Sequence, residues 1–251
     1  MLSFYGKMST EVYDLDKPIG ASFKDVEYYK SRLADCTGLI LEPAVGTGRI
    51  LIPLLEAGLN VEGIDCSIEM LDVCRKNCED RGFSPNLYQD DMQTFTLPVK
   101  YEAIIIPTGS FLLLKDFQAS IEALNNFYEH LLPGGRLIID IFLQPDLKKG
   151  LVSTRSWTTN KGELITLEEK LIEVNYINQY TVSHFRYEKW KDQQLIQTEL
   201  EYFPLRWYGV EEFKMILENI GFADITISAD YKFDEFPTDP EQTITFEAFR
   251  L

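Results

Sequence analysis

The sequence predicts an α/β fold in which helices cover a mostly parallel β-sheet. From residue 38 to residue 142, short apolar runs alternate with segments of helical periodicity, which is typical of repeated strand–helix units. The composition, 45% hydrophobic and 25% charged, is that of an ordinary globular protein. The 251 residues are enough to bury a full hydrophobic core. A single α/β unit that carries an insertion is therefore expected.

The apolar runs and their spacing give the expected elements. Strands are expected at residues 39–41, 61–64, 87–89, 103–106 and 137–141. Residues 116–132 place apolar side chains at helical spacing, and the Pro-Gly-Gly turn at 133–135 ends that helix. The remaining expectations are one helix at 22–33, one from 210 to the glycine at 221, and final strands at 225–229 and 243–249.

The stretch from Trp157 to Tyr208 has a different pattern. Helical periodicity fades, apolar side chains fall on alternating positions, and polar turns are expected at 178–179 and 191–192. We predict three antiparallel strands inserted into the core. The predicted organisation is an N-terminal cap at 1–37, a core at 38–150, the inserted sheet at 151–208 and the completion of the core at 209–251.

The charge and the cysteines limit the classes of partner. Lys plus Arg number 24 and Asp plus Glu number 40, for a net charge of −16, so a nucleic-acid partner is disfavoured. The first 18 residues lack the apolar region of a signal peptide and no long apolar run follows, so we expect a cytoplasmic protein without a membrane span. The four cysteines have neither disulfide-framework nor zinc-site spacing, and no metal site is expected.

A small-residue turn follows the first expected strand and begins a helix. It reads Glu42-Pro-Ala-Val-Gly-Thr-Gly-Arg49. Such a turn lets the backbone approach a ligand and directs free N–H groups at it, so a nucleotide-type ligand is predicted. A dinucleotide fingerprint anchored on Gly46 would need glycine where the chain has Ala44 and Arg49, which argues against NAD. The Glu42 carboxylate is suited to a cationic amino-acid end.

The second expected strand ends in Asp65, which lies 19 residues after Gly46. At that spacing in a strand–helix–strand unit, an acidic side chain reaches the neighbouring strand tip and can accept hydrogen bonds from both ribose hydroxyls. Ser67 is then expected to cap the following helix. The two tips together predict a nucleoside site.

At this point the chain resembles the class I S-adenosylmethionine-dependent methyltransferase family, over nearly its whole length. Four segments match the family's motifs in order: the turn at 42–49, with Ala44 in place of the first glycine, the acidic ribose motif at 65–71, the adenine motif at 89–92 and the turn at 132–137. The resemblance implies a Rossmann-like, doubly wound, mostly parallel seven-stranded sheet with an inserted small antiparallel sheet. It also implies S-adenosyl-L-methionine as cofactor and S-adenosyl-L-homocysteine as product.

The resemblance also implies roles for individual residues. Asp65 would hold the ribose, Met70 or Cys66 would pack near the adenine, and Asp91 with the backbone of Met92 would read the adenine edge, Asp90 being the less favoured of the acidic pair. The other expected cofactor contacts come from the turn, the tip of the fourth strand and an N-terminal tyrosine: Glu42, Pro43, Ala44, Gly46, Thr47, Arg49, Pro107, Ser110 and Tyr13.

The methyl acceptor is expected to be a small molecule with a nitrogen or oxygen acceptor atom. The segment from Pro107 to Phe111 departs from the Asn/Asp-Pro-Pro-Tyr pattern of enzymes that methylate planar amino nitrogens. His184 is the one weak candidate for a base, facing either pocket or solvent, whereas His130 is expected to be solvated or to complement the dipole of its helix. Ten aromatic residues lie between 157 and 208. Three roles are open for them: packing on the core, lining an acceptor pocket, or forming a dimer surface.

Two other functions stay open, namely an NAD(P)-dependent oxidoreductase and a non-catalytic S-adenosylmethionine-binding module. No Tyr-x-x-x-Lys-type pair supports the first, and no residue excludes the second. A monomer and a homodimer are both compatible with the sequence.

Overall fold

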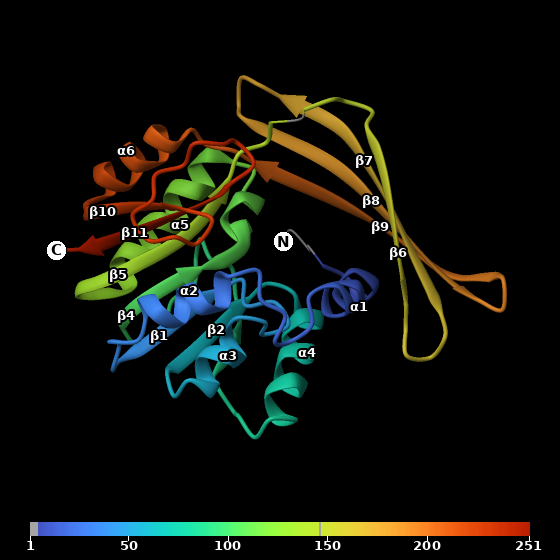
Figure 1. Cartoon of the computed structure of the whole chain (residues 1–251), viewed down its shortest axis with the longest axis horizontal. Coiled ribbons are helices and arrows are strands. Elements are labelled where there is room, and N and C mark those ends of the chain that lie inside the picture. The colour runs from blue at the N-terminus through green and yellow to red at the C-terminus, as the bar shows by residue number, and fades with distance from the viewer. Residues whose placement is uncertain (1–4, 146) are drawn as a thin grey trace.

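A seven-stranded sheet forms the centre of the larger part of the molecule (Figure 1). The computed structural model describes residues 5–145 and 147–251. The strand order is β10-β11-β5-β4-β1-β2-β3, and only β11 runs antiparallel to its neighbours. The doubly wound, mostly parallel sheet is confirmed. Its strands are β1 (Leu39–Pro43), β2 (Asn60–Asp65), β3 (Leu87–Gln89), β4 (Tyr101–Ile106), β5 (Leu131–Phe142), β10 (Phe222–Ala229) and β11 (Thr243–Arg250).

Helices pack on both faces of this sheet because alternate strand residues point to opposite faces. In β1, Leu41 joins the apolar cluster of α5 and α6, whereas Ile40 joins that of α2, α3 and α4. Figure 1 shows α5 and α6 on one side of the sheet and α2 and α3 on the other. The helices are α2 (Asp25–Arg32), α3 (Leu51–Glu56), α4 (Ile68–Glu79), α5 (Phe117–His130) and α6 (Val210–Ile220), with a 3-10 segment η1 (Pro107–Leu113) after β4.

The signals that begin and end these helices are those that the sequence predicts. Ser67 accepts a hydrogen bond from the Met70 N–H and so caps α4. The Asp116 side chain caps α5 in the same way. Gly221 ends α6 with a φ of 119°, a left-handed conformation that suits glycine. No helix within residues 5–145 and 147–251 has the length and apolar character needed to cross a membrane.

The inserted sheet has four antiparallel strands, so the expectation of three is wrong. They are β6 (Val152–Thr158), β7 (Leu164–Asn175), β8 (Tyr180–Lys191) and β9 (Gln194–Arg206), in that order across the sheet. Figure 1 shows this sheet standing away from the seven-stranded one. The edge strand β6 is not predicted from the sequence because nearly all of its side chains are exposed. It therefore lacks the alternating apolar pattern on which strand prediction depends.

The N-terminal segment holds two helices instead of the single one expected at 22–33. The additional helix, α1 (Lys7–Asp16), lacks a side-chain cap at Gly6 and an acidic first turn, so no start signal announces it. Met8 and Val12 bury themselves against Ile165 and Tyr187 of the small sheet. Helix α1 therefore connects the N-terminus to strands that lie more than a hundred residues further along the chain.

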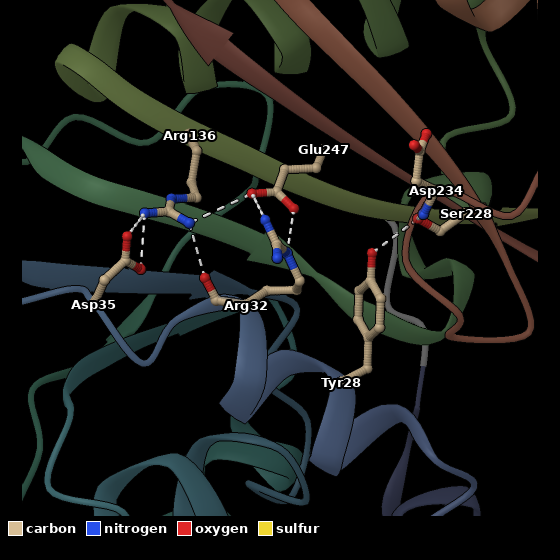
Figure 2. Close-up of polar contacts among 7 residues, drawn as sticks. All are labelled: Tyr28, Arg32, Asp35, Arg136, Ser228, Asp234 and Glu247. Carbon is tan, nitrogen blue, oxygen red and sulfur yellow. Dashed lines mark hydrogen bonds and ion pairs between the residues drawn. The ribbon is translucent and has the colours of Figure 1, made fainter.

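A network of polar contacts fastens α2 and the residues after it to β5 and β11 (Figure 2). The Glu247 carboxylate accepts hydrogen bonds from the Arg32 Nε at 2.7 Å and from Arg136 at 3.4 Å. The second Arg136 nitrogen donates to Asp35 at 2.9 Å. The Glu247 side chain is 2% exposed, whereas that of Asp35 is 71% exposed. Glu247 is therefore the buried centre of the network, and Asp35 is its solvent end.

Candidate active site

A hollow lies at the carboxyl ends of β1, β2, β3 and β4, where ligands bind in doubly wound folds. Its wall includes nine of the residues that the sequence predicts to contact a cofactor: Tyr13, Ala44, Gly46, Asp65, Cys66, Met70, Asp91, Met92 and Ser110. Six further residues complete the wall: Tyr5, Ile64, Asp90, Gln93, Leu113 and Leu114. Segments far apart in the sequence therefore converge on one site.

The turn after β1 brings backbone close to the hollow through three left-handed residues. Ala44, Gly46 and Gly48 have φ values of 58°, 57° and 88°. A Cβ on Gly48 would lie 2.9 Å from the Sγ atom of Cys74, so only glycine lets the turn pack on α4. Ala44 holds its positive φ without being glycine, which is strained backbone at a ligand site.

Asp65 connects the tips of β1 and β2. Its Oδ2 atom accepts a hydrogen bond from the Gly46 N–H at 2.9 Å, and its Oδ1 atom accepts one from the Ser67 N–H at 2.9 Å. The residue is 7% exposed, and burial raises the pKa of Asp65 against the lowering effect of these bonds. Each carboxylate oxygen has further lone pairs, so acceptor capacity remains on the side of the hollow.

The acidic pair after β3 lies in the wall together with the two residues that follow it. Asp91 accepts a hydrogen bond from the Gln93 N–H at 2.9 Å, and Asp90 accepts one from the Asp91 N–H at 2.8 Å. These local bonds fix the loop. The sequence favours Asp91 over Asp90, yet both reach the wall, and Gln93 is an addition that no motif announces.

Tyr5 and Tyr13 form the aromatic part of the wall of the hollow, and this pair is called the roof below. Their rings meet edge to face at 5.8 Å, and Tyr5 meets Phe203 of β9 at 6.3 Å. The Tyr5 carbonyl accepts a hydrogen bond from the Ser67 hydroxyl at 2.8 Å, and the next N–H, of Gly6, donates to Glu201 at 2.9 Å. The roof thus binds to α4 on one side and to the small sheet on the other. Tyr13 is predicted, whereas Tyr5 has no sequence signal because its partners are remote.

Five predicted cofactor residues do not line the hollow: Glu42, Pro43, Thr47, Arg49 and Pro107. Arg49 points toward α2, where it pairs with Asp25 at 2.5 Å and donates to the Ala21 carbonyl. Its guanidinium is committed to a buried ion pair, which explains why it is absent from the wall. Pro43, Thr47 and Pro107 are buried behind the wall. Their roles toward a cofactor stay predictions.

Glu42 lies deeper than the sequence suggests and keeps an unused acceptor. It is 2% exposed, and its Oε2 atom is buried without a hydrogen-bond partner among the described residues. Burial holds the pKa of Glu42 well above its usual value, although Arg49 acts in the opposite direction. A buried, unpartnered carboxylate at a strand tip is costly unless something pairs with it. The residues present therefore fit a ligand that carries a cationic group.

Neither histidine lies in the wall. His184 meets Tyr202 at 5.4 Å, and by strand alternation it lies on the face of β8 opposite to Tyr187, which packs against α1. Of the two roles expected for His130, the solvated one is wrong, whereas its place in the last turn of α5 is as expected. The residue is 7% exposed, its Nδ1 lies 2.9 Å from the Asn126 carbonyl, and its Nε2 accepts a hydrogen bond from the Leu97 N–H at 3.3 Å. His130 has a structural role in the core.

The fold and the hollow define an enzyme class that binds a nucleoside at two adjacent strand tips. A family model described as a methyltransferase domain matches residues 40–135. The putative methyltransferase YqeM of Bacillus subtilis (strain 168) is 28% identical over 221 residues, which are 84% of this chain and 83% of that protein. A glycine/sarcosine N-methyltransferase of Aphanothece halophytica is 28% identical over 80% of this chain and 72% of that protein.

Solved structures show the same fold. The crystal structure of an S-adenosylmethionine-dependent methyltransferase from Clostridium acetobutylicum ATCC 824 has a TM-score of 0.77, with 16% identity over 96% of each chain. Residues 40–135 therefore form a methyltransferase domain, and the chain is an S-adenosylmethionine-dependent methyltransferase with S-adenosylmethionine as its cofactor. The match to a methyltransferase domain contradicts the alternative of an NAD(P)-dependent oxidoreductase.

Proposed function

We propose that this methyltransferase transfers the methyl group to a nitrogen or oxygen atom of a small-molecule acceptor by in-line displacement. The observation that carries the proposal is the roof of Tyr5 and Tyr13, which lines the hollow and whose chain at residues 5–6 is hydrogen-bonded to both Ser67 at the start of α4 and Glu201 of the small sheet. A roofed hollow suits an acceptor small enough to enter it. The net charge of −16 further disfavours a nucleic-acid acceptor.

The chain's residues supply orientation and exclude water. When bound, S-adenosylmethionine provides a methyl group on a sulfonium that is already electrophilic. Alignment of an acceptor behind that methyl contributes about 7–11 kcal/mol in well-oriented systems, so a dedicated base is optional for an acceptor that presents a free lone pair. A protonated amine or a hydroxyl must in addition give up its proton to a base or to solvent. The apolar side chains of Ile64, Met70, Leu113 and Leu114 line the hollow and keep water from it. His184 has no place in this chemistry, since it lies away from the wall.

We assign the cofactor contacts as the sequence predicts them, with two additions. Asp65 accepts from the ribose hydroxyls, Asp91 and the Met92 backbone contact the adenine, and Glu42 receives the ammonium group. The additions are Tyr5, which covers the hollow, and Asp90, which joins Asp91 at the adenine edge. These assignments are supported by the wall composition and by the unpartnered Glu42 oxygen.

Amines are the first acceptors to test, because a relative is named as a glycine/sarcosine N-methyltransferase. We expect release of S-adenosylhomocysteine in the presence of at least one small amine, phenol or carboxylic acid, followed by mass spectrometry of the methylated product. Controls are the same reactions with Asp65→Ala and without acceptor. Acceptor-independent release, or turnover on nucleic acid alone, would contradict the proposal. A cytoplasmic location and a monomeric or homodimeric state stay predictions.

The protonation of Glu42 gives a second test. Because burial raises the pKa of Glu42, a bound ammonium should favour the carboxylate over the protonated form and so lower that pKa. Binding of S-adenosylhomocysteine should therefore release protons, and affinity should rise as the pH rises toward the raised pKa of Glu42 in the free protein. Calorimetry in buffers of different ionisation enthalpy measures the number of protons released. Glu42→Gln should bind more weakly and release none; equal release by both proteins would refute the assignment.

A further inference from the structure

A buried carboxylate on β5 holds the turn that follows β4. Asp140 is fully buried, and its Oδ2 atom accepts a hydrogen bond from the Thr108 N–H at 2.8 Å. Thr108 and the next residue, Gly109, have φ values of 56° and 73°. Threonine is β-branched and rarely adopts a positive φ. Its conformation persists only where the surroundings impose it, and the Asp140 carboxylate is one such constraint.

Asp140 receives hydrogen bonds from two further elements of the fold. The Tyr231 hydroxyl, from the loop after β10, donates to Oδ2 at 3.0 Å, and the Thr245 hydroxyl of β11 donates to Oδ1 at 2.7 Å. The Tyr29 phenol of α2 also faces the carboxylate. Burial raises the pKa of Asp140 to about 6, and the hydrogen bonds oppose that shift. A carboxylate at this position makes a charge-assisted hydrogen bond with the Thr108 N–H, which is stronger than a neutral one.

The turn that Asp140 holds forms one end of the hollow. Ser110, two residues after Thr108, lies in the wall, and Leu113 and Leu114 follow it. The turn is also packed from behind, because a Cβ on Gly109 would lie 2.3 Å from the Phe142 ring. Thr108 itself borders a second hollow, of about 400 Å³, that Tyr231 also lines. A displaced turn would therefore reshape the wall of the cofactor hollow.

We infer that Asp140 is a positioning residue for methyl transfer, whose carboxylate holds the Thr108 N–H and so keeps the strained turn that shapes the Ser110 end of the hollow. Asp140 touches neither cofactor nor acceptor and acts through the turn. This inference rests on the proposed function, which makes the hollow that Ser110 lines the site of methyl transfer.

Four variants separate this role from a merely structural one. Asp140→Ala removes the acceptor of the Thr108 N–H, and we expect it to weaken S-adenosylhomocysteine binding about tenfold by calorimetry and to lower kcat at saturating cofactor. Asp140→Asn keeps an acceptor oxygen in place and should restore both quantities to within about threefold of wild type. Thr245→Val removes the hydrogen bond that the Thr245 hydroxyl donates to Oδ1 of Asp140. It should leave the affinity for S-adenosylhomocysteine within about twofold of wild type.

The fourth variant tests the strain directly. Glycine adopts a φ of 56° readily, so Thr108→Gly placed in the Asp140→Ala background should recover part of the lost affinity and provides a folded protein should Asp140→Ala alone not fold. Wild-type affinity for Asp140→Ala, an equal loss for Thr245→Val, no rescue by Asp140→Asn, or no recovery in the double variant would each overturn the inference. Failure of the wild type itself to bind would instead overturn the proposed function.

Discussion

Asp65→Ala is expected to abolish the rise in melting temperature that S-adenosylhomocysteine causes in the wild-type protein. At a ligand concentration of about 100 Kd the wild type should gain about 2.7 kcal/mol, which is roughly 5–10 °C for a chain of this size. Loss of a carboxylate that accepts from two ribose hydroxyls removes about 3 kcal/mol or more of binding free energy, or roughly a hundredfold or more in Kd. Thermal-shift titration and calorimetry measure both quantities.

Two matched variants make the Asp65 experiment specific. Asp65→Asn keeps one acceptor oxygen and should bind with intermediate affinity. Asp72→Ala removes an exposed carboxylate on α4 whose one ion-pair partner among the described residues is Arg75, so its thermal shift should equal that of the wild type. A full ligand-induced shift in Asp65→Ala would remove Asp65 from the site and with it the nucleoside assignment of the hollow.

Glu247→Ala is expected to destabilise the fold by about 3–5 kcal/mol, the range for breaking a buried ion pair from one side. The substitution leaves Arg32 and Arg136 without the carboxylate that both contact, and their side chains are only 26% and 12% exposed. Arg136 keeps its pair with Asp35, whereas Arg32 keeps no ion-pair partner among the described residues, so a partly buried guanidinium without a counter-ion is the physical reason for the large effect. Urea denaturation at neutral pH measures the change in the free energy of unfolding.

The control for Glu247 lies in the same network (Figure 2). Asp35→Ala removes the solvent end of the network, where the side chain is 71% exposed, so the loss should not exceed about 1 kcal/mol. A similar small loss for both variants would mean that solvent reaches Arg32 and Arg136 after the Glu247 substitution, contrary to the buried geometry.

The central sheet and the main wall of the hollow are predictable because they depend on local patterns. Apolar runs separated by helical segments specify β1, β2 and β4, and the spacing of Gly46 and Asp65 places both at adjacent strand tips. Asp65 does meet the Gly46 N–H. In these elements local periodicity and residue spacing determine where the side chains lie, so these two patterns are enough to predict them.

The rest depends on contacts between distant segments. Tyr5 enters the wall because its neighbours bind Ser67 and Glu201, and nothing in the first residues announces that. Arg49 belongs to the motif turn, yet its partner Asp25 draws it away from the hollow. Strand β6 and helix α1 lack the local signals on which prediction relies. Side-chain direction at long range is fixed by packing, which a linear pattern does not contain.

The position of the two chain ends has a practical consequence for handling this enzyme. Tyr5 forms part of the roof, whereas Figure 1 shows the C-terminus at the far side of the seven-stranded sheet. Leu251 is 76% exposed. An affinity tag or a fluorescent fusion therefore belongs after Leu251, where it is remote from the cofactor hollow.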